Sequence, residues 1–164
     1  MFHAPSRFPF AAVLEQHWRG IYDEYLGITG QLVDWVEKEL YDEGWKVFAL
    51  FDFPHGRPVP ANVAKCPQTA SLVERHVARH GAAGFSLLTP KTRIRAHEGY
   101  QGEFLRCHLG LKIPAGDCGL RVRGDVRRWE PGKVLIFDDR VTHESWNLTD
   151  EERVVLLIDF VPDA

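Results

Sequence analysis

The chain has few of the features that mark disulfide-bonded, membrane-spanning or nucleic-acid-binding proteins. Its three cysteines, Cys66, Cys107 and Cys118, are an odd number and form no Cys-x-x-Cys pair. This pattern favours a reduced chain over a disulfide framework. No hydrophobic run is close to the length of about 20 residues that a helix needs to cross a bilayer. The N-terminus lacks the basic and apolar regions of a signal peptide. We therefore expect a cytoplasmic protein without a membrane anchor.

An excess of positive charge is also absent. The 20 Lys and Arg residues are outnumbered by 23 Asp and Glu, which gives a net charge of −3. We therefore expect no nucleic-acid partner and no general attraction to anionic lipid. The hydrophobic content of 45% and the charged content of 26% are ordinary for a globular protein. The length fits one domain with a core of its own, but it does not indicate an oligomeric state.

The first part of the chain carries helical patterns. Apolar and aromatic side chains recur at helical spacing from Ala11 to Tyr25, and again from Gln31 to Tyr41. A third helix is predicted from Pro67 to His80, because proline is favoured in a first helical turn. Between the second and third helices, the run WKVFALFDF from Trp45 to Phe53 predicts a strand.

From Ala83 onward, short strand-like runs alternate with clusters of Gly, Pro and Asp. These runs are GFSLLT, TRIRAH, EFLRCHLGLKI, CGLRVR, KVLIFD, THESWN and RVVLLIDF. With the earlier strand the count reaches about eight, which suits a double-sheet jelly roll, or double-stranded β-helix. Helices first and strands after is an α+β order. We predict one domain over residues 1–164, with a helical part to about residue 44 packed on one outer face of a cupin-like jelly-roll core.

Three of the eight histidines, His97, His108 and His143, lie in the strand-rich part. Imidazole is the commonest nitrogen ligand for iron, copper and zinc. Jelly-roll iron oxygenases bind their metal through a His-x-acid motif and a distant histidine. Here the motif is His97-Glu98-Gly99, so the acid is absent and Glu98 would point to the opposite side of an extended backbone. Glycine would leave room for a water, and His143 is the natural distal ligand.

Two arginines of the same region would need an anion if buried. Arg153 follows His143 across the turn sequence NLTDEE, so a hairpin would return it beside the strand that holds this histidine. A guanidinium binds a carboxylate through two parallel bonds. Arg106 and His108 alternate on one strand, so they share a face that is costly to bury without a ligand. Ser86 could add a hydroxyl donor from a neighbouring strand.

These residues also have ordinary structural interpretations. The histidines and the serine could be satisfied or merely tolerated side chains of the barrel, and the Arg-x-His pair could form an internal polar network. Arg153 could pair at the surface with a neighbouring glutamate. Asp138 and Asp139 resemble metal carboxylates, but their turn favours a structural role as caps before the distal histidine. Trp129, in the turn WEPG, is expected to pack in the core.

Taken together, HEG, RCHLGLKIP, GKVLIFDD, HESWN and RVVLLIDF resemble the aspartyl/asparaginyl β-hydroxylase family of iron(II)- and 2-oxoglutarate-dependent oxygenases. The resemblance runs from about Ser86 to the C-terminus. It implies that His97 and His143 bind Fe(II), with glycine in place of the usual acid. It also implies that Ser86 and Arg153 hold the distal carboxylate of 2-oxoglutarate.

The resemblance further places Arg106 and His108 near the other end of the cosubstrate, with Arg106 as a catalytic residue. Family members that hydroxylate peptide aspartates carry an arginine where this chain has Phe104. We therefore expect a substrate with an apolar or neutral portion, such as a small amino-acid-derived molecule, rather than an acidic peptide. The implied activity is hydroxylation of an unactivated C–H bond with dioxygen. The alternative is a non-catalytic, cupin-like module or sensor that binds a metal or small molecule.

Overall fold

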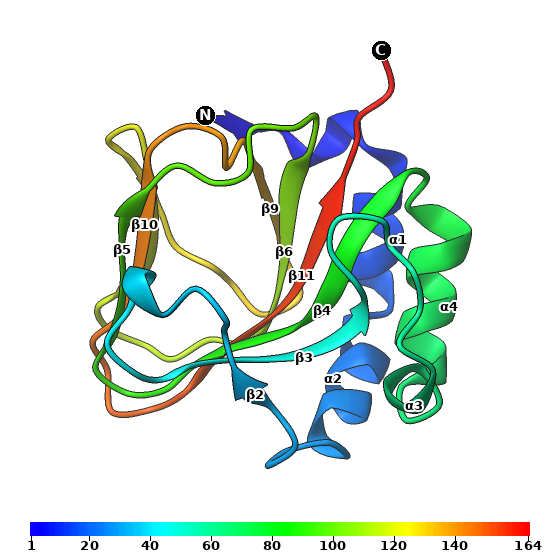
Figure 1. Cartoon of the computed structure of the whole chain (residues 1–164), viewed down its shortest axis with the longest axis horizontal. Helices are drawn as coiled ribbons and strands as arrows, with labels where there is room; N and C mark the ends of the chain where they lie inside the picture. The colour runs from blue at the N-terminus through cyan, green and yellow to red at the C-terminus, as the bar shows by residue number, and fades with distance from the viewer.

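The computed structural model describes residues 1–164 as two facing β-sheets with helices along one side (Figure 1). The helices are α1 (Pro9–Gln16), α2 (Trp18–Leu26), α3 (Pro60–Val63) and α4 (Pro67–His76), with 3-10 turns at Pro5–Arg7 and Lys38–Leu40. The strands are β1 (Phe2–His3), β2 (Val33–Asp34), β3 (Trp45–Phe51), β4 (His80–Leu88), β5 (Thr92–His97), β6 (Leu105–Lys112), β7 (Cys118–Val122), β8 (Asp125–Arg127), β9 (Val134–Phe137), β10 (His143–Asn147) and β11 (Arg153–Phe160).

The topology confirms the predicted jelly roll. A seven-stranded sheet has the order β1-β9-β6-β11-β4-β3-β2, and a four-stranded sheet has the order β5-β10-β7-β8. Every pairing is antiparallel, and most neighbours in space are distant in sequence. The strands outnumber the expected about eight because short strands such as β1, β2 and β8 extend the sheet edges. None of the helices has the length and apolar character needed to cross a bilayer.

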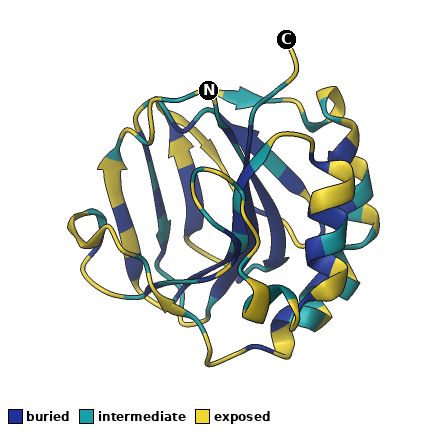
Figure 2. Cartoon of the chain, turned by 45° about the vertical axis from the view of Figure 1, so that its right-hand side comes forward, coloured by how far each residue is buried: buried dark blue, intermediate teal, exposed yellow.

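The helices cover the outer face of the large sheet, as predicted (Figure 2). Leu14 of α1, Ile21 of α2 and Val73 of α4 join a cluster of 27 buried residues with side chains such as Phe85 and Leu156 of the sheet. Burial of apolar surface at about 25 cal/mol per Å² makes this layer the main source of folding free energy. The other face of the large sheet points toward the small sheet, and the site lies there.

Side-chain parity along β11 separates these two faces. Residues 154, 156, 158 and 160 join the helix-facing cluster, whereas the alternate positions face the gap between the sheets. Arg153 and Asp159 are two of these inward positions, and both are buried. Successive strand residues point to opposite faces, so one strand supplies apolar contacts on one side and charged groups on the other.

The predicted helix from Gln31 to Tyr41 is wrong. This segment contains β2 and a 3-10 turn, and Val33 and Val36 are exposed. Trp35 instead stacks on Trp45 of β3, with ring centroids 4.5 Å apart and planes 11° apart. The helical spacing of its apolar residues therefore reflects contacts with a neighbouring strand and with a pocket, not one buried helix face.

Two other predicted helices have different limits. The expected helix from Ala11 to Tyr25 is divided at His17, whose φ of −102° and ψ of 10° are not helical. The third helix ends at His76 instead of His80, because His80 pairs with Phe160 as the first residue of β4. Both errors concern element ends, where local patterns compete with tertiary pairing.

Candidate functional site

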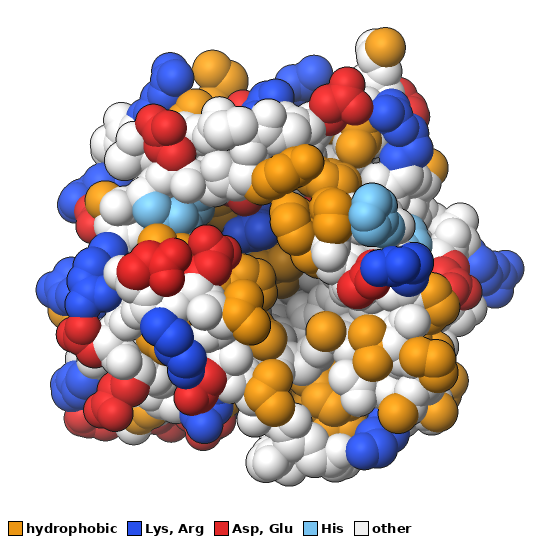
Figure 3. Space-filling model, in the orientation of Figure 1, with side chains coloured by type: hydrophobic (Ala, Val, Ile, Leu, Met, Phe, Trp, Pro, Cys, Tyr) orange, Lys and Arg blue, Asp and Glu red, His pale blue; other side chains and the backbone are white.

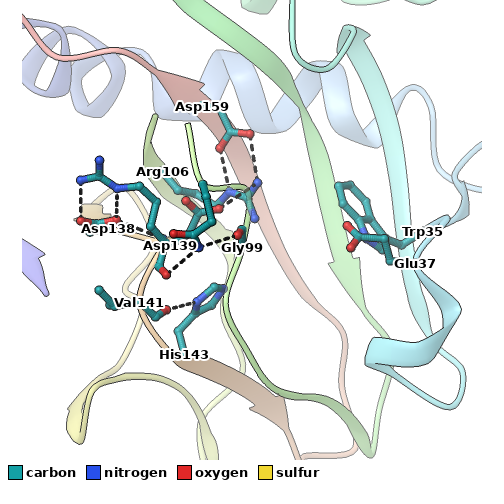
Figure 4. Close-up of polar contacts among 11 residues, drawn as sticks. Trp35, Glu37, Gly99, Arg106, Asp138, Asp139, Val141, His143 and Asp159 are labelled. Carbon is teal, nitrogen blue, oxygen red and sulfur yellow. Dashed lines mark hydrogen bonds and ion pairs between the residues drawn. The ribbon is translucent and has the colours of Figure 1, made fainter. Parts of the chain in front are cut away.

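His97 and His143 face each other at one end of the small sheet. They are register partners on β5 and β10, and their ring centroids lie 4.3 Å apart. Each Nδ1 lies beside the carbonyl oxygen two residues earlier, at 2.7 Å for Arg95 and 2.8 Å for Val141. Figure 4 shows the contact between His143 and Val141. A carbonyl only accepts, so each Nδ1 donates, and each Nε2 is left with a free lone pair. This is the orientation that metal-binding histidines adopt.

His143 has the protonation that a metal ligand needs. Burial lowers the pKa of His143 to about 4, although the hydrogen bond to the Val141 carbonyl opposes this shift. The imidazole is therefore neutral at physiological pH, and only neutral imidazole binds a metal. No group of three or more His, Cys, Asp or Glu side chains is arranged to hold an ion. The two-histidine metal site therefore stays a prediction.

The gap expected beside Gly99 is not there. A Cβ at this position would lie 2.6 Å from Oδ2 of Asp139 and 2.8 Å from its carbonyl oxygen. The Gly99 amide donates to that carbonyl oxygen over 2.7 Å, which holds the two loops together (Figure 4). A buried carboxylate thus occupies the space that a side chain at this position would take. Burial raises the pKa of Asp139, and Arg106 opposes the shift.

Arg106 is held by two acids that the sequence reasoning did not assign to the site. Its Nε and Nη2 donate to the carboxylate of Asp159 over 2.7 and 3.0 Å, and Nη2 lies 3.4 Å from Asp139. Burial disfavours its charge, but Asp159, Asp139 and then Glu37 together raise the pKa above the ordinary arginine value. The turn-cap interpretation fits Asp138, which accepts from the Arg140 amide, but it is wrong for Asp139.

The second half of the site lies on the large sheet around Arg153. This side chain is 1% exposed and forms no ion pair, so the surface pairing with a neighbouring glutamate is wrong. Its Nη2 donates to the carbonyl oxygen and Oγ of Ser86, while its Nε is buried without a partner. The guanidinium lies 4.6 Å from the Trp129 ring centroid, a cation–π contact. Burial lowers the pKa of Arg153 to about 10, as expected for an unpaired charge.

His108 presents a second unused donor. The indole Nε1 of Trp129 donates to its Nδ1 over 3.1 Å. Since indole can only donate, Nδ1 accepts and the ring proton of the neutral imidazole lies on Nε2. That Nε2 is buried and has no partner. Burial, and then the charges of Arg153 and Arg106, lower the pKa of His108 well below its ordinary value, so the ring stays neutral.

Ser86 completes a group of donors. Its Oγ accepts from Trp45 Nε1 and from Arg153 Nη2, both over 3.1 Å. A hydroxyl has two acceptor positions and one donor, so only its proton remains free. The free donors of Ser86, His108 and Arg153 line one inner pocket with the paired histidines. Unsatisfied buried donors cost about 1–3 kcal/mol each, and an acceptor-only carboxylate would relieve the cost.

The inner pocket divides its chemistry between the two sheets. The paired histidines lie on β5 and β10 of the small sheet, whereas Ser86, His108 and Arg153 lie on β4, β6 and β11 of the large sheet. The free space between them is about 20 Å³, enough for about one water. A larger anion would therefore have to displace side chains such as the Arg153 guanidinium from Ser86.

An outer pocket of about 390 Å³ shares His97, Arg106 and Trp45 with the inner one. Hydrophobic side chains surround the hollow on this face of the molecule, and acidic side chains lie along one rim (Figure 3). Phe104 is not one of its lining residues. It packs behind two residues that do line the pocket, Phe53 and Tyr100. Its ring centroid lies 6.2 Å from that of Phe53 and 6.1 Å from that of Tyr100.

Comparison with known proteins extends the resemblance beyond the strand-rich part. The aspartyl/asparaginyl beta-hydroxylase family matches residues 15–162, so the helical part belongs to the match as well. The chain is 37% identical over 167 residues to the ornithine lipid ester-linked acyl 2-hydroxylase of Rhizobium tropici, covering 95% of this chain and 58% of that protein. It is 33% identical over 154 residues to the aspartyl/asparaginyl beta-hydroxylase of Mus musculus, covering 89% of this chain and 20% of that protein.

Solved structures support the fold. A Pseudomonas putida prolyl-4-hydroxylase superposes with a TM-score of 0.57 at 15% identity, over 94% of this chain and 100% of that one. A cupin-2 domain from Rhodospirillum rubrum superposes with a TM-score of 0.50 at 11% identity, over 81% of this chain and 70% of that one. From the match over residues 15–162 and the likeness to curated relatives over about nine-tenths of its length, the chain belongs to the aspartyl/asparaginyl beta-hydroxylase family.

Proposed function

We propose that this chain is an iron(II)- and 2-oxoglutarate-dependent hydroxylase. One observation carries the proposal: buried donors on Arg153 and His108 have no acceptor, and they line the same pocket as two histidines with free Nε2 atoms. The donors suit a carboxylate and the nitrogens suit iron. Nothing else in the pocket matches the positive charge of Arg153, so an anionic cosubstrate gives its burial a physical reason.

The residues present fit both groups. His97 and His143 would hold iron through Nε2, while Ser86, His108 and Arg153 would bind carboxylate oxygens of 2-oxoglutarate. Bound iron supplies the oxidising chemistry, in which one oxygen atom of dioxygen enters a substrate C–H bond as hydroxyl, and the other enters succinate as carbon dioxide leaves. The protein positions the reactants and keeps bulk water away.

Arg106 has a positioning part in this proposal. It lines both pockets, and the two hydrogen bonds that it donates to the Asp159 carboxylate fix its guanidinium. A planar guanidinium held on one edge keeps the direction of its remaining N–H groups. We place it at the junction between cosubstrate and substrate, where it would orient whichever polar group of either molecule reaches it.

The substrate proposal follows from the outer pocket. Its walls include Trp35, Phe53 and Tyr100, and they offer apolar surface in front of the paired histidines. Phe104 supports that wall from behind instead of lining it. We propose a small or acyl-bearing substrate with an apolar portion near the reacting carbon. The name of the Rhizobium tropici relative, an acyl 2-hydroxylase, is compatible with such a substrate.

The test combines cosubstrate turnover with product mass. The purified chain receives Fe(II), 2-oxoglutarate and dioxygen with acyl esters, free amino acids or an aspartyl peptide, and succinate and the gain of one oxygen atom are measured. We expect substrate-dependent succinate with an acyl or amino-acid compound, and none with His97→Ala. Tight binding of metal and 2-oxoglutarate with no succinate from any substrate would favour the alternative, a non-catalytic binding module.

A further inference from the structure

Glu37 brings an unpaired carboxylate to the outer pocket. It lies across the pocket from Arg106, beside Trp35 (Figure 4). The Trp35 indole Nε1 donates to its Oε1 over 3.2 Å, and no lysine or arginine forms an ion pair with it. The adjacent Lys38 is directed to Asp34 instead, over 2.9 Å. One carboxylate oxygen of Glu37 thus remains free at the entrance to the site.

The other charges of the pocket do not compensate for this acid. Arg106 is the only lysine or arginine in its lining. It donates two hydrogen bonds to Asp159 and forms an ion pair with Asp139, whereas Glu37 acts on its charge without direct contact and as the weakest of the three acids. Asp139 itself lines the same pocket. An anionic group entering here would meet carboxylates without a free cation, whereas a cationic group would meet an acceptor of opposite charge.

Exposed aromatic and aliphatic side chains line the same pocket as Glu37. Val36 is 83% exposed, Phe53 47% and Tyr100 53%, and all three line this pocket. Phe53 and Tyr100 meet edge to face, with ring centroids 5.1 Å apart. Large apolar side chains gathered at one exposed hollow mark a binding surface. Aromatic faces also attract ammonium groups, with the largest effect when the cation loses water.

We propose that the outer pocket recognises the ammonium group of an amphipathic substrate through the Glu37 carboxylate and the surrounding aromatic side chains. This inference rests on the proposed function, because it takes the occupant to be the molecule that is hydroxylated. The apolar part of the same molecule would lie along Phe53 and Tyr100, toward the paired histidines. The cation would stay at the entrance, where it remains partly hydrated and its desolvation cost is low.

A binding experiment without turnover tests the charge preference. The full chain is titrated at pH 7 with hexylammonium, hexanol and hexanoate, which share one alkyl chain, and the indole N–H signal of Trp35 is followed by NMR. The titrations are run with and without Zn(II), a diamagnetic ion, and 2-oxoglutarate. We expect hexylammonium to bind about tenfold more tightly than hexanol, because it adds a charge-assisted hydrogen bond. Hexanoate should bind most weakly of the three.

Matched variants assign the preference to one residue. Glu37→Gln keeps the size of the side chain and an oxygen for Trp35, and it should lower hexylammonium affinity about tenfold while leaving hexanol unchanged. Glu39→Gln is the control, because Glu39 is an exposed acid two residues away that does not line the pocket. The proposal is wrong if hexanoate binds as tightly as hexylammonium, or if the two variants behave alike.

The outcomes also separate this inference from the hydroxylase assignment. Succinate formation without any Glu37-dependent preference for the ammonium probe would contradict the cation site and support the hydroxylase assignment. A Glu37-dependent preference for the ammonium probe, with no succinate from any substrate, would support the cation site and contradict the hydroxylase assignment. In the second case the pocket would bind a cationic amphiphile in a protein that does not oxidise it.

Discussion

The inner and outer pockets meet at His97 and Arg106, but they are built differently. The inner pocket takes its polar groups from strands, and hydrogen bonds such as Trp129 to His108 fix their orientation. The outer pocket takes most of its walls from segments between strands, and three of its apolar side chains, Val36, Phe53 and Tyr100, are exposed. Strand register holds chemical groups in place, whereas loops change with little cost to the fold. This contrast suits a fixed reaction centre beneath an adaptable binding surface.

Loss of a histidine should have the largest effect and should be confined to the inner pocket. His97→Ala and His143→Ala are each expected to lose metal binding and to reduce succinate formation to background, because one imidazole is too few to hold an ion. Calorimetry with Mn(II) measures the first effect. His76→Ala, on the exposed surface of α4, is the control. Metal affinity unchanged in either active-site variant would contradict the two-histidine site.

Arg153→Lys should have the next largest effect and should separate the cosubstrate from the metal. Lysine keeps the charge but loses the planar fork and the contact with the Trp129 ring. We expect 2-oxoglutarate to bind about tenfold to a hundredfold more weakly, with Mn(II) affinity little changed. Titration of 2-oxoglutarate into the Mn(II)-loaded chain measures it. Equal affinity in the wild type and the variant would refute the proposed role of Arg153 in binding 2-oxoglutarate.

The burial of His108 predicts an acid-sensitive fold. Its pKa is lowered in the folded chain, so below about pH 6.5 the unfolded chain binds more protons and stability falls as pH falls. His143 shifts in the same direction. His108→Gln removes one of these two imidazoles. The free energy of unfolding of the variant should therefore depend less steeply on pH than that of the wild type between about pH 7 and 5. Urea unfolding across that range measures the slopes, and parallel curves would contradict the prediction.

Phe104→Leu should have the smallest effect and should act on the outer pocket alone. Phe104 packs against Phe53, Tyr100 and the backbone at Gly81. A smaller side chain should reduce packing behind Phe53 and Tyr100 and raise the KM of the substrate that is hydroxylated about threefold. The affinity for 2-oxoglutarate, measured on the same sample, should not change. A change in cosubstrate affinity instead would show that the two pockets are not independent.

The inner pocket could be predicted from the sequence because alternation along strands determines which side chains share a face. The shared face of Arg106 and His108 on β6 follows from this rule. The expected hairpin that returns Arg153 beside the strand of His143 is wrong, because β10 and β11 lie in different sheets and Arg153 pairs with Leu88 of β4. Asp159 lies six residues after Arg153 on the same strand, so both side chains point to the inner face. It is the only acid in this mostly apolar strand, which could have identified it as a residue of the site. Trp129 is buried as expected, but its hydrogen bond to His108 depends on a contact that no spacing reveals.

The outer pocket could not be predicted in the same way. Trp35 and Val36 have helical spacing with their neighbours, yet one stacks on Trp45 and the other is exposed at the pocket. Asp139 looked like a turn cap because the sequence does not show that it is buried beside Gly99. Irregular segments take their conformation from distant contacts, and local periodicity carries no information about those contacts.

The paired histidines lie on one sheet and the unpartnered donors of Arg153 and His108 on the other, so in the proposed function the distance between the sheets sets the length of the molecule that reaches both. A diacid that reached both ends would bridge two layers that are otherwise joined by packing and loops. Its carbon count would then decide its fit, because packed sheets keep a separation of about 10 Å. Shorter and longer keto diacids should fail to span the layers without strain. Substitutions that thin or thicken the apolar layer between the sheets would retune which length the protein accepts.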